Sequence, residues 1–234
     1  MLTRDLTMRN PLRLLDDVKD GLLEPGDFGA VSSRSGGGKT ALTVQLALNA
    51  LLQGKKVLHI SLNDPVEKVD LWYQEVLNQM AGQYSEIRIN QLWDMLLPHR
   101  LIMTFLAQGF SVATLEERLL DLSKQNIFTP EILVVDGFDF DGDCRPMLEQ
   151  FKGLALQHGF HIWFTVNTHR HEAPADNGYP VQLGNLSDLF KTILQLKSGD
   201  GPVAIRVLKY PEGASPKANL VLDPNTLLIQ DPNS

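Results

Sequence analysis

A glycine-rich loop between an apolar strand and a long uncharged helix is the feature that most constrains the fold of this chain. Residues 28–32 are typical of a buried strand, and residues 39–53 predict a helix. Glycines at 36–38 join the two and are followed by Lys39 and Thr40. Backbone N–H groups at a helix start attract anions, and a lysine and a hydroxyl beside them suit the phosphates and Mg²⁺ of a nucleotide. The sequence therefore predicts a phosphate-binding loop.

This loop differs in one position from the usual spacing of phosphate-binding loops. The spacing G-x-x-x-x-G-K-[ST] would place its first glycine at position 33, where the chain has Ser33. The alternative is a glycine-rich turn that precedes Lys39 and Thr40 by chance, but the strand before the loop and the uncharged helix after it favour phosphate binding. The predicted phosphate-binding residues are Ser33, Arg34, Ser35, Gly36, Gly37, Gly38, Lys39 and Thr40.

An aspartate at the end of a second apolar strand is the other part of the predicted site. Residues 132–135 are apolar and lead directly into Asp136. Because ligands of open parallel sheets bind at the carboxyl ends of the strands, Asp136 and Thr40 are predicted to hold Mg²⁺ or its water shell. The acidic run at 139–143 lacks the glycine and the glutamate of an EF-hand. It is interpreted as a solvated loop in which Asp143 caps the next helix.

The order of the other segments predicts an α/β fold. Strands are predicted at 57–62, 101–106, 132–135 and 161–166, and helices from Asp64, around 89–97, from Thr114 and up to Gly159. Asp64 and Thr114 are the expected N-caps of their helices, with Pro65 at the first helical position. Alternating strands and helices are typical of a mostly parallel, doubly wound sheet with helices on both faces.

From about Lys191 the pattern changes to short strand-like runs. These runs, 192–196, 203–208, 220–222 and 226–229, are separated by turns that contain glycine or proline. They are interpreted as antiparallel strands that finish one edge of the same sheet. Without internal repeats, the chain is predicted to form one domain over 1–234, with residues up to about Asn10 as an N-terminal arm.

Composition narrows the classes of function. The chain has 21 Lys and Arg against 28 Asp and Glu, and its net charge of −7 disfavours a protein that coats nucleic acid, although local basic patches remain compatible with it. The single cysteine, Cys144, excludes an intrachain disulfide and agrees with a reducing cytoplasm. The uncharged runs are shorter than the roughly 20 residues that span a bilayer. The sequence therefore predicts a cytoplasmic protein without a membrane span.

Several aromatic and histidine residues have a structural and a functional interpretation. His59 lies in an apolar strand, and Trp72, Tyr73 and Trp93 keep helical spacing, so all four are interpreted as core residues rather than base-stacking groups. The histidines at 169 and 171 lack further ligands at metal-binding spacing and are interpreted as parts of a polar loop.

With these residues placed, the chain resembles the RecA-fold ATPases, and most the branch of the DnaB-type replicative helicases and the KaiC-type clock ATPases. The resemblance extends over about residues 10–230. The segment 31–40 is similar to the phosphate loop of that branch, in which the first glycine is often another small residue. The resemblance implies a RecA-like P-loop domain that binds ATP with Mg²⁺.

The second strand of that family carries the catalytic glutamate, which acts as the base that orients water against the γ-phosphate. The segment VLHISLNDP resembles this strand and has Asn63 at the position of the glutamate. Asp64 beside it is a carboxylate, but the predicted helix cap is the favoured role for that residue. The resemblance therefore makes Asn63 and Asp64 the candidates for water positioning, without a glutamate.

Two later segments can also be compared with the family. The segment IWFTVNTHR resembles the strand that carries a polar γ-phosphate sensor, which places Asn167 at the sensor position and Arg170 just beyond it. The segment IRVLKYPEGA resembles a hairpin that, in ring-forming relatives, sends a lysine and an arginine into the nucleotide of the neighbouring subunit. Lys209 matches this lysine, whereas Pro211 stands in place of the arginine. The resemblance thus implies a homo-oligomer.

These comparisons predict an ATP-binding protein that hydrolyses ATP slowly or only with a protein partner. A nucleotide-gated scaffold or regulatory subunit that never hydrolyses ATP is the alternative from a different class. A DNA-directed motor is the less favoured third hypothesis, because the chain is acidic and has no run of basic residues for a DNA-tracking loop.

Overall fold

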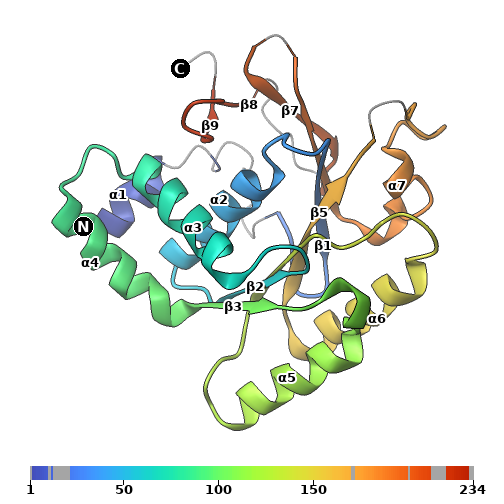
Figure 1. Ribbon diagram of the computed structural model, residues 1–234, viewed down its shortest axis with the longest axis horizontal. Coiled ribbons are helices and arrows are strands. Elements are labelled where there is room, and N and C mark those ends of the chain that lie inside the picture. Colours follow the sequence, from blue (N-terminus) through green and yellow to red (C-terminus); the bar gives the residue numbers. More distant parts are fainter. Residues whose placement is uncertain are drawn as a thin grey trace.

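The computed structural model describes residues 2–9, 12, 22–169, 172–199, 201–211 and 220–231. Within them, nine strands form one sheet in the order β3-β2-β4-β5-β1-β6-β7-β8-β9 (Figure 1). The strands are β1 Phe28–Ser33, β2 Val57–Ser61, β3 Arg100–Thr104, β4 Ile132–Asp136, β5 His161–Asn167, β6 Thr192–Lys197, β7 Val203–Lys209, β8 Val221–Leu222 and β9 Ile229–Gln230. The pairs from β3 to β6 are parallel, and those from β6 to β9 are antiparallel. The predicted α/β class with a mostly parallel sheet is therefore confirmed.

Helices cover both faces of this sheet, as predicted. They are α1 Leu2–Arg9, α2 Lys39–Leu52, α3 Val66–Met80, α4 Glu86–Leu96, α5 Val112–Lys124, α6 Arg145–His158 and α7 Val181–Gly184, with short 3-10 turns at Leu97–His99, Ala107–Gly109 and Ser187–Leu189. One apolar core joins α1–α4 to the sheet, and a second joins α5–α7 to the opposite face. Figure 1 shows α1–α4 grouped on the left and α5 and α6 at the lower right. None of these helices combines the length and the apolar character needed to cross a membrane.

Helix α2 is almost entirely buried, as its uncharged sequence predicts. Even Gln45 on its polar stripe is 1% exposed. Its amide donates a hydrogen bond to the Leu227 carbonyl (2.6 Å) and accepts one from the Ile229 N–H (3.0 Å). Buried polar groups need such partners. Gln45 therefore ties the last strand of the sheet to the helix that follows the glycine-rich loop.

The direction of β6 corrects the prediction for the C-terminal runs. All four runs were expected to be antiparallel, but β6 pairs in parallel with β1, from Gly29 opposite Thr192 to Ser32 opposite Gln195. Only its other edge, against β7, is antiparallel. The parallel part of the sheet therefore extends one strand further, so the carboxyl end of β6 lies at the same edge as that of β1.

Three predicted helix caps are also wrong. Helix α3 begins at Val66 with Pro65 as N-cap residue, and the Asp64 carboxylate instead pairs with Lys68 (2.8 Å). Helix α5 begins before Thr114, because the Ser111 hydroxyl accepts a hydrogen bond from the Thr114 N–H (3.1 Å). Helix α6 has Cys144 rather than Asp143 at its N-cap. The stretch expected to form an arm contains α1, whose Leu6 is 3% exposed in the core.

Candidate functional site

The glycine-rich loop connects β1 to α2 at the carboxyl edge of the sheet. Gly36 (φ 73°) and Gly38 (φ 91°) have left-handed backbone conformations that favour glycine. A Cβ on Gly37 would lie 2.4 Å from Ser33 Oγ, so a side chain there would force the loop to shift. The backbone conformation or a close contact thus explains why each of these three positions is a glycine. Gly38 gives α2 no side-chain cap, so the N–H groups at the helix start receive no hydrogen bond from the side chain of the N-cap residue.

Lys39 holds its ammonium group inside this loop. Its Nζ donates hydrogen bonds to the carbonyls of Ser33 (3.2 Å) and Arg34 (3.0 Å), and the residue is only 9% exposed. Burial lowers the pKa of Lys39, while the negative charge of Asp136 opposes that shift. The Lys39 charge is therefore already held at the loop without a ligand, rather than extended into solvent.

The predicted Mg²⁺ residues, Thr40 and Asp136, lie together. Thr40 Oγ1 donates a hydrogen bond to Asp136 Oδ2 (3.1 Å) and thereby joins the first turn of α2 to the end of β4. Thr165 on β5 donates to the other carboxylate oxygen, Oδ1 (2.6 Å), and accepts a hydrogen bond from the Gly137 N–H (3.2 Å). Both oxygens of the carboxylate are thus oriented by hydroxyl groups.

Thr165 is a site residue that sequence reasoning missed. The only signal was a lone hydroxyl in an apolar strand, two residues before the predicted sensor Asn167. Side chains two residues apart in a strand share one face of the sheet. The contact of Thr165 with Asp136 depends on the register of β4 against β5, in which Val135 lies opposite Phe164.

Asn63 and Asp64 differ in their surroundings. Asn63 is exposed and lies against the turn after β4, since a Cβ on Gly137 would lie 2.4 Å from Asn63 Nδ2. The Asp64 side chain is occupied by Lys68 in the first turn of α3. Of the two candidates for water positioning, Asn63 is therefore the one whose side chain contacts the end of β4.

Asn167 is exposed at the end of β5, and its register partner is Ser33 at the end of β1. The next residue, Thr168, donates its N–H to the Ser33 carbonyl (2.9 Å). The candidate sensor is therefore adjacent to the start of the glycine-rich loop. Arg170 lies outside the described residues.

The structure does not bring Lys209 to the phosphate loop of its own chain. Lys209 ends β7 opposite Ile193, near the amino end of β6, whereas the loop follows the carboxyl end of β1. Its Nζ donates to the Ser187 carbonyl (2.7 Å). A role for Lys209 at the nucleotide of a neighbouring subunit stays a prediction, as does the homo-oligomer that it requires.

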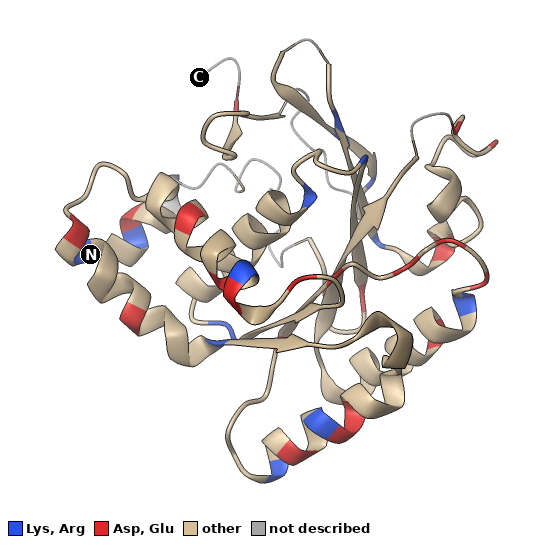
Figure 2. Ribbon diagram, viewed as in Figure 1, with Lys and Arg blue, Asp and Glu red and all other residues tan. Residues whose placement is uncertain are grey.

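The acidic loop after β4 is solvated, as predicted. Its three aspartates, at 139, 141 and 143, are exposed, and Figure 2 shows acidic residues (red) along this loop. His169 pairs with Asp141 (3.0 Å), and this hydrogen bond raises the pKa of the histidine. No group of three or more metal-ligating side chains gathers within the described ranges, and His171 falls outside them.

The aromatic candidates belong to the core, as predicted. His59 is fully buried, and its Nδ1 lies 3.1 Å from the Tyr73 hydroxyl. Burial is the main cause that lowers the pKa of His59, to about 4. Trp72 and Trp93 are partly buried and pack against the core of α1–α4.

No protein-family model matches this chain, and no curated protein matches it. Function is therefore inferred from the residues that gather at the carboxyl edge of the sheet.

Proposed function

We propose that the chain binds Mg·ATP at the glycine-rich loop, as RecA-like P-loop proteins do. The observation that carries this proposal is the placement of the two charges of the site. The Lys39 ammonium is enclosed by the loop, and the Asp136 carboxylate is joined to the start of α2 through Thr40. A cation for phosphate and a carboxylate for Mg²⁺ thus flank the same helix start.

The residues at the helix start suit both the phosphates of ATP and the Mg²⁺ ion. Glycines with left-handed backbone allow the tight turn of the loop, and the start of α2 adds the positive end of the helix dipole. Thr40 and Asp136 offer the hard oxygen ligands that Mg²⁺ prefers. Bound Mg²⁺ would supply positive charge against the phosphates. Since Lys39 is already ordered, little side-chain entropy is lost when its ammonium meets a phosphate oxygen.

We infer further that the isolated chain hydrolyses ATP slowly. Asn63 contacts the end of β4, but an amide can hold a water molecule without accepting its proton. The nearest alternative base, Asp64, is engaged by Lys68. We therefore expect slow or partner-dependent hydrolysis. The lack of a free carboxylate base also favours the second candidate function, a nucleotide-gated scaffold or regulatory subunit that never hydrolyses ATP.

Calorimetric titration with ATP and Mg²⁺ tests the binding site. Lys39→Ala removes charge-assisted hydrogen bonds worth about 1.5–3 kcal/mol each, so we expect an affinity loss of about tenfold to more than a hundredfold. The matched control is Lys124→Ala, which removes the same charge from an exposed position at the end of α5. The control should bind ATP as the wild type does.

Two outcomes would contradict the assignment. One is a wild-type protein that shows no affinity at millimolar ATP, and the other is a Lys39→Ala variant with unchanged affinity. Circular dichroism of both variants would show whether a loss of binding reflects a loss of folding.

A further inference from the structure

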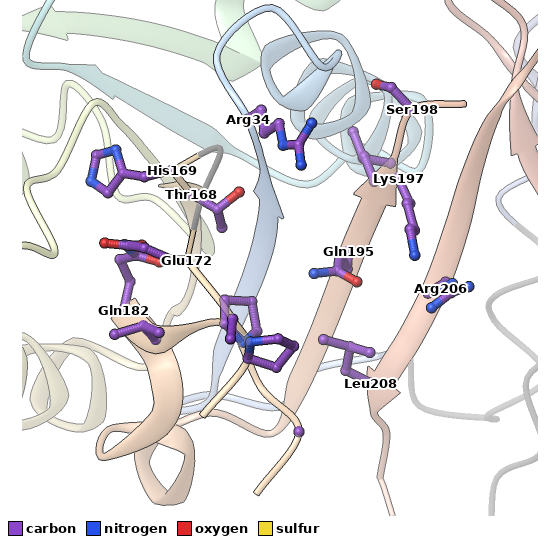
Figure 3. Close-up of a pocket in the computed structure, with 16 residues that line it drawn as sticks. Arg34, Thr168, His169, Glu172, Gln182, Gln195, Lys197, Ser198, Arg206 and Leu208 are labelled. Carbon is purple, nitrogen blue, oxygen red and sulfur yellow. The ribbon is translucent and has the colours of Figure 1, made fainter. Parts of the chain in front are cut away.

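A second cavity opens beside the phosphate loop, at the ends of β5 and β6 (Figure 3). It has a volume of about 300 Å³, at the lower end of the range of small-molecule pockets. Leu208 on its wall packs against the core of α5–α7, whereas α2 belongs to the core on the opposite face of the sheet. The cavity therefore adjoins the proposed ATP site and shares Arg34 of the glycine-rich loop with it, but its β7 wall lies on the face of the sheet opposite α2.

One wall of the cavity is basic. Lys197 on β6 and Arg206 on β7 line it from neighbouring strands, and Arg34 reaches it from the loop after β1 (Figure 3). Within the ranges that the structure describes, neither Lys197 nor Arg206 forms an ion pair. Cations gathered around one space repel each other, and an anion placed between them relieves that repulsion. In a chain with a net charge of −7, this gathering is not a consequence of overall composition.

The opposite wall carries hydrogen-bond acceptors. Gln182 in α7 is 6% exposed, and its Nε2 donates to Glu172 Oε2 (2.6 Å). Its Oε1 is buried and has no hydrogen-bond partner. The Glu172 carboxylate beside it is exposed and lines the cavity, so this wall is suited to a ligand that brings a hydroxyl or an amino group.

From these two walls we propose that the cavity binds a small phosphate monoester whose other end carries hydrogen-bond donors. A phosphate dianion matches Lys197 and Arg206 better than a single carboxylate, which would leave one cation uncompensated. A polynucleotide fits less well, because the Glu172 carboxylate on the opposite wall repels further phosphates. The ligand class is thus a phosphorylated sugar or a similar hydroxylated phosphate.

The probe for this proposal is ribose 5-phosphate, which has hydroxyl donors and no nucleobase. Calorimetric titration of the wild-type chain should show saturable binding below about 10 mM. Arg206→Gln and Lys197→Gln should each weaken it at least about tenfold, because each removes a charge-assisted hydrogen bond. Lys124→Gln, at the exposed end of α5, is the matched control and should bind as the wild type does.

The Lys39→Ala variant separates this proposal from the proposed ATP site. If ribose 5-phosphate binds at the second cavity, Lys39→Ala should retain its affinity within about twofold. Loss of affinity in Lys39→Ala with full affinity in Arg206→Gln would place the sugar phosphate at the phosphate loop, which would overturn this proposal and leave the proposed function intact.

Two further results would overturn it. One is the absence of any binding by the wild type at millimolar ribose 5-phosphate. The other is salt-sensitive binding of a short single-stranded oligonucleotide that depends on Arg206, without affinity for the sugar phosphate. Unfolding curves of both glutamine variants, whose substituted side chains are exposed, would show that they fold.

Discussion

The two ends of the candidate site are built differently. Where the phosphates would bind, Lys39, Thr40 and Asp136 are fixed by hydrogen bonds that connect the loop, α2 and β4. Where hydrolysis would occur, Asn63 and Asn167 are exposed. From this contrast we infer that the proposed ATP binding can occur without efficient ATP turnover.

The largest expected effect comes from supplying a base at the open end. Asn63→Glu places a carboxylate next to the turn after β4, and a positioned base contributes roughly 100-fold or more to a reaction. We therefore expect the rate of ATP hydrolysis to rise about 100-fold, with ATP affinity changed by less than about twofold. Steady-state phosphate release measures the first quantity and calorimetry the second.

Asn63→Gln is the matched control, because it lengthens the side chain as much as glutamate does without adding a base. Only the glutamate variant should gain activity. If neither variant gains activity, the open end near Asn63 lacks other groups needed for hydrolysis besides a base.

Removing the carboxylate at the organised end has the next largest effect. Asp136→Asn keeps one acceptor oxygen for Thr40 or Thr165, places an NH2 donor at the other position and loses its negative charge. The gain in ATP affinity on adding Mg²⁺ should therefore fall by about tenfold, whereas affinity in EDTA should change little. Paired titrations with and without Mg²⁺ measure this difference.

Asp139→Asn removes a comparable charge from the solvated loop and is its control. An unchanged Mg²⁺ effect in Asp136→Asn would argue against a metal at the end of β4.

The smallest expected effect concerns Asp64. This carboxylate pairs with Lys68, and the two side chains are 30% and 57% exposed, so the pair contributes only about 0–1 kcal/mol to stability. Asp64→Asn should accordingly leave the slow hydrolysis of the wild type within about twofold. Loss of all residual hydrolysis in Asp64→Asn, but not in Asn63→Ala, would identify Asp64 as the base.

The sequence was sufficient to predict the organised end because its signals are local. The strand, the glycine-rich loop and α2 are consecutive in the chain, and their order fixes their geometry. The contact between Thr40 and Asp136 was also accessible, since the carboxyl ends of parallel strands meet at one edge. Thr165 could not be found in this way, because its contact depends on the register between β4 and β5.

The errors also have physical causes. A short apolar run predicts a strand but not its direction, so the pairing of β6 with β1 required knowledge of where the chain crosses the sheet. Ser111 and Thr114 lie one helical turn apart and both can cap α5. A capping pattern in the sequence therefore does not decide between them.

Whether the protein binds Mg·ATP but hydrolyses it slowly is tested by a turnover assay beside a nucleotide-binding measurement on the same purified protein. We expect saturable binding of Mg·ATP that Lys39→Ala weakens at least about tenfold, together with hydrolysis far below the roughly 1–1,000 per second of typical enzymes. Rapid hydrolysis by the isolated wild type, lost in Lys39→Ala, would contradict the claim that the hydrolytic end is incomplete. Absence of any Mg·ATP binding would contradict the claim that the other end binds phosphate.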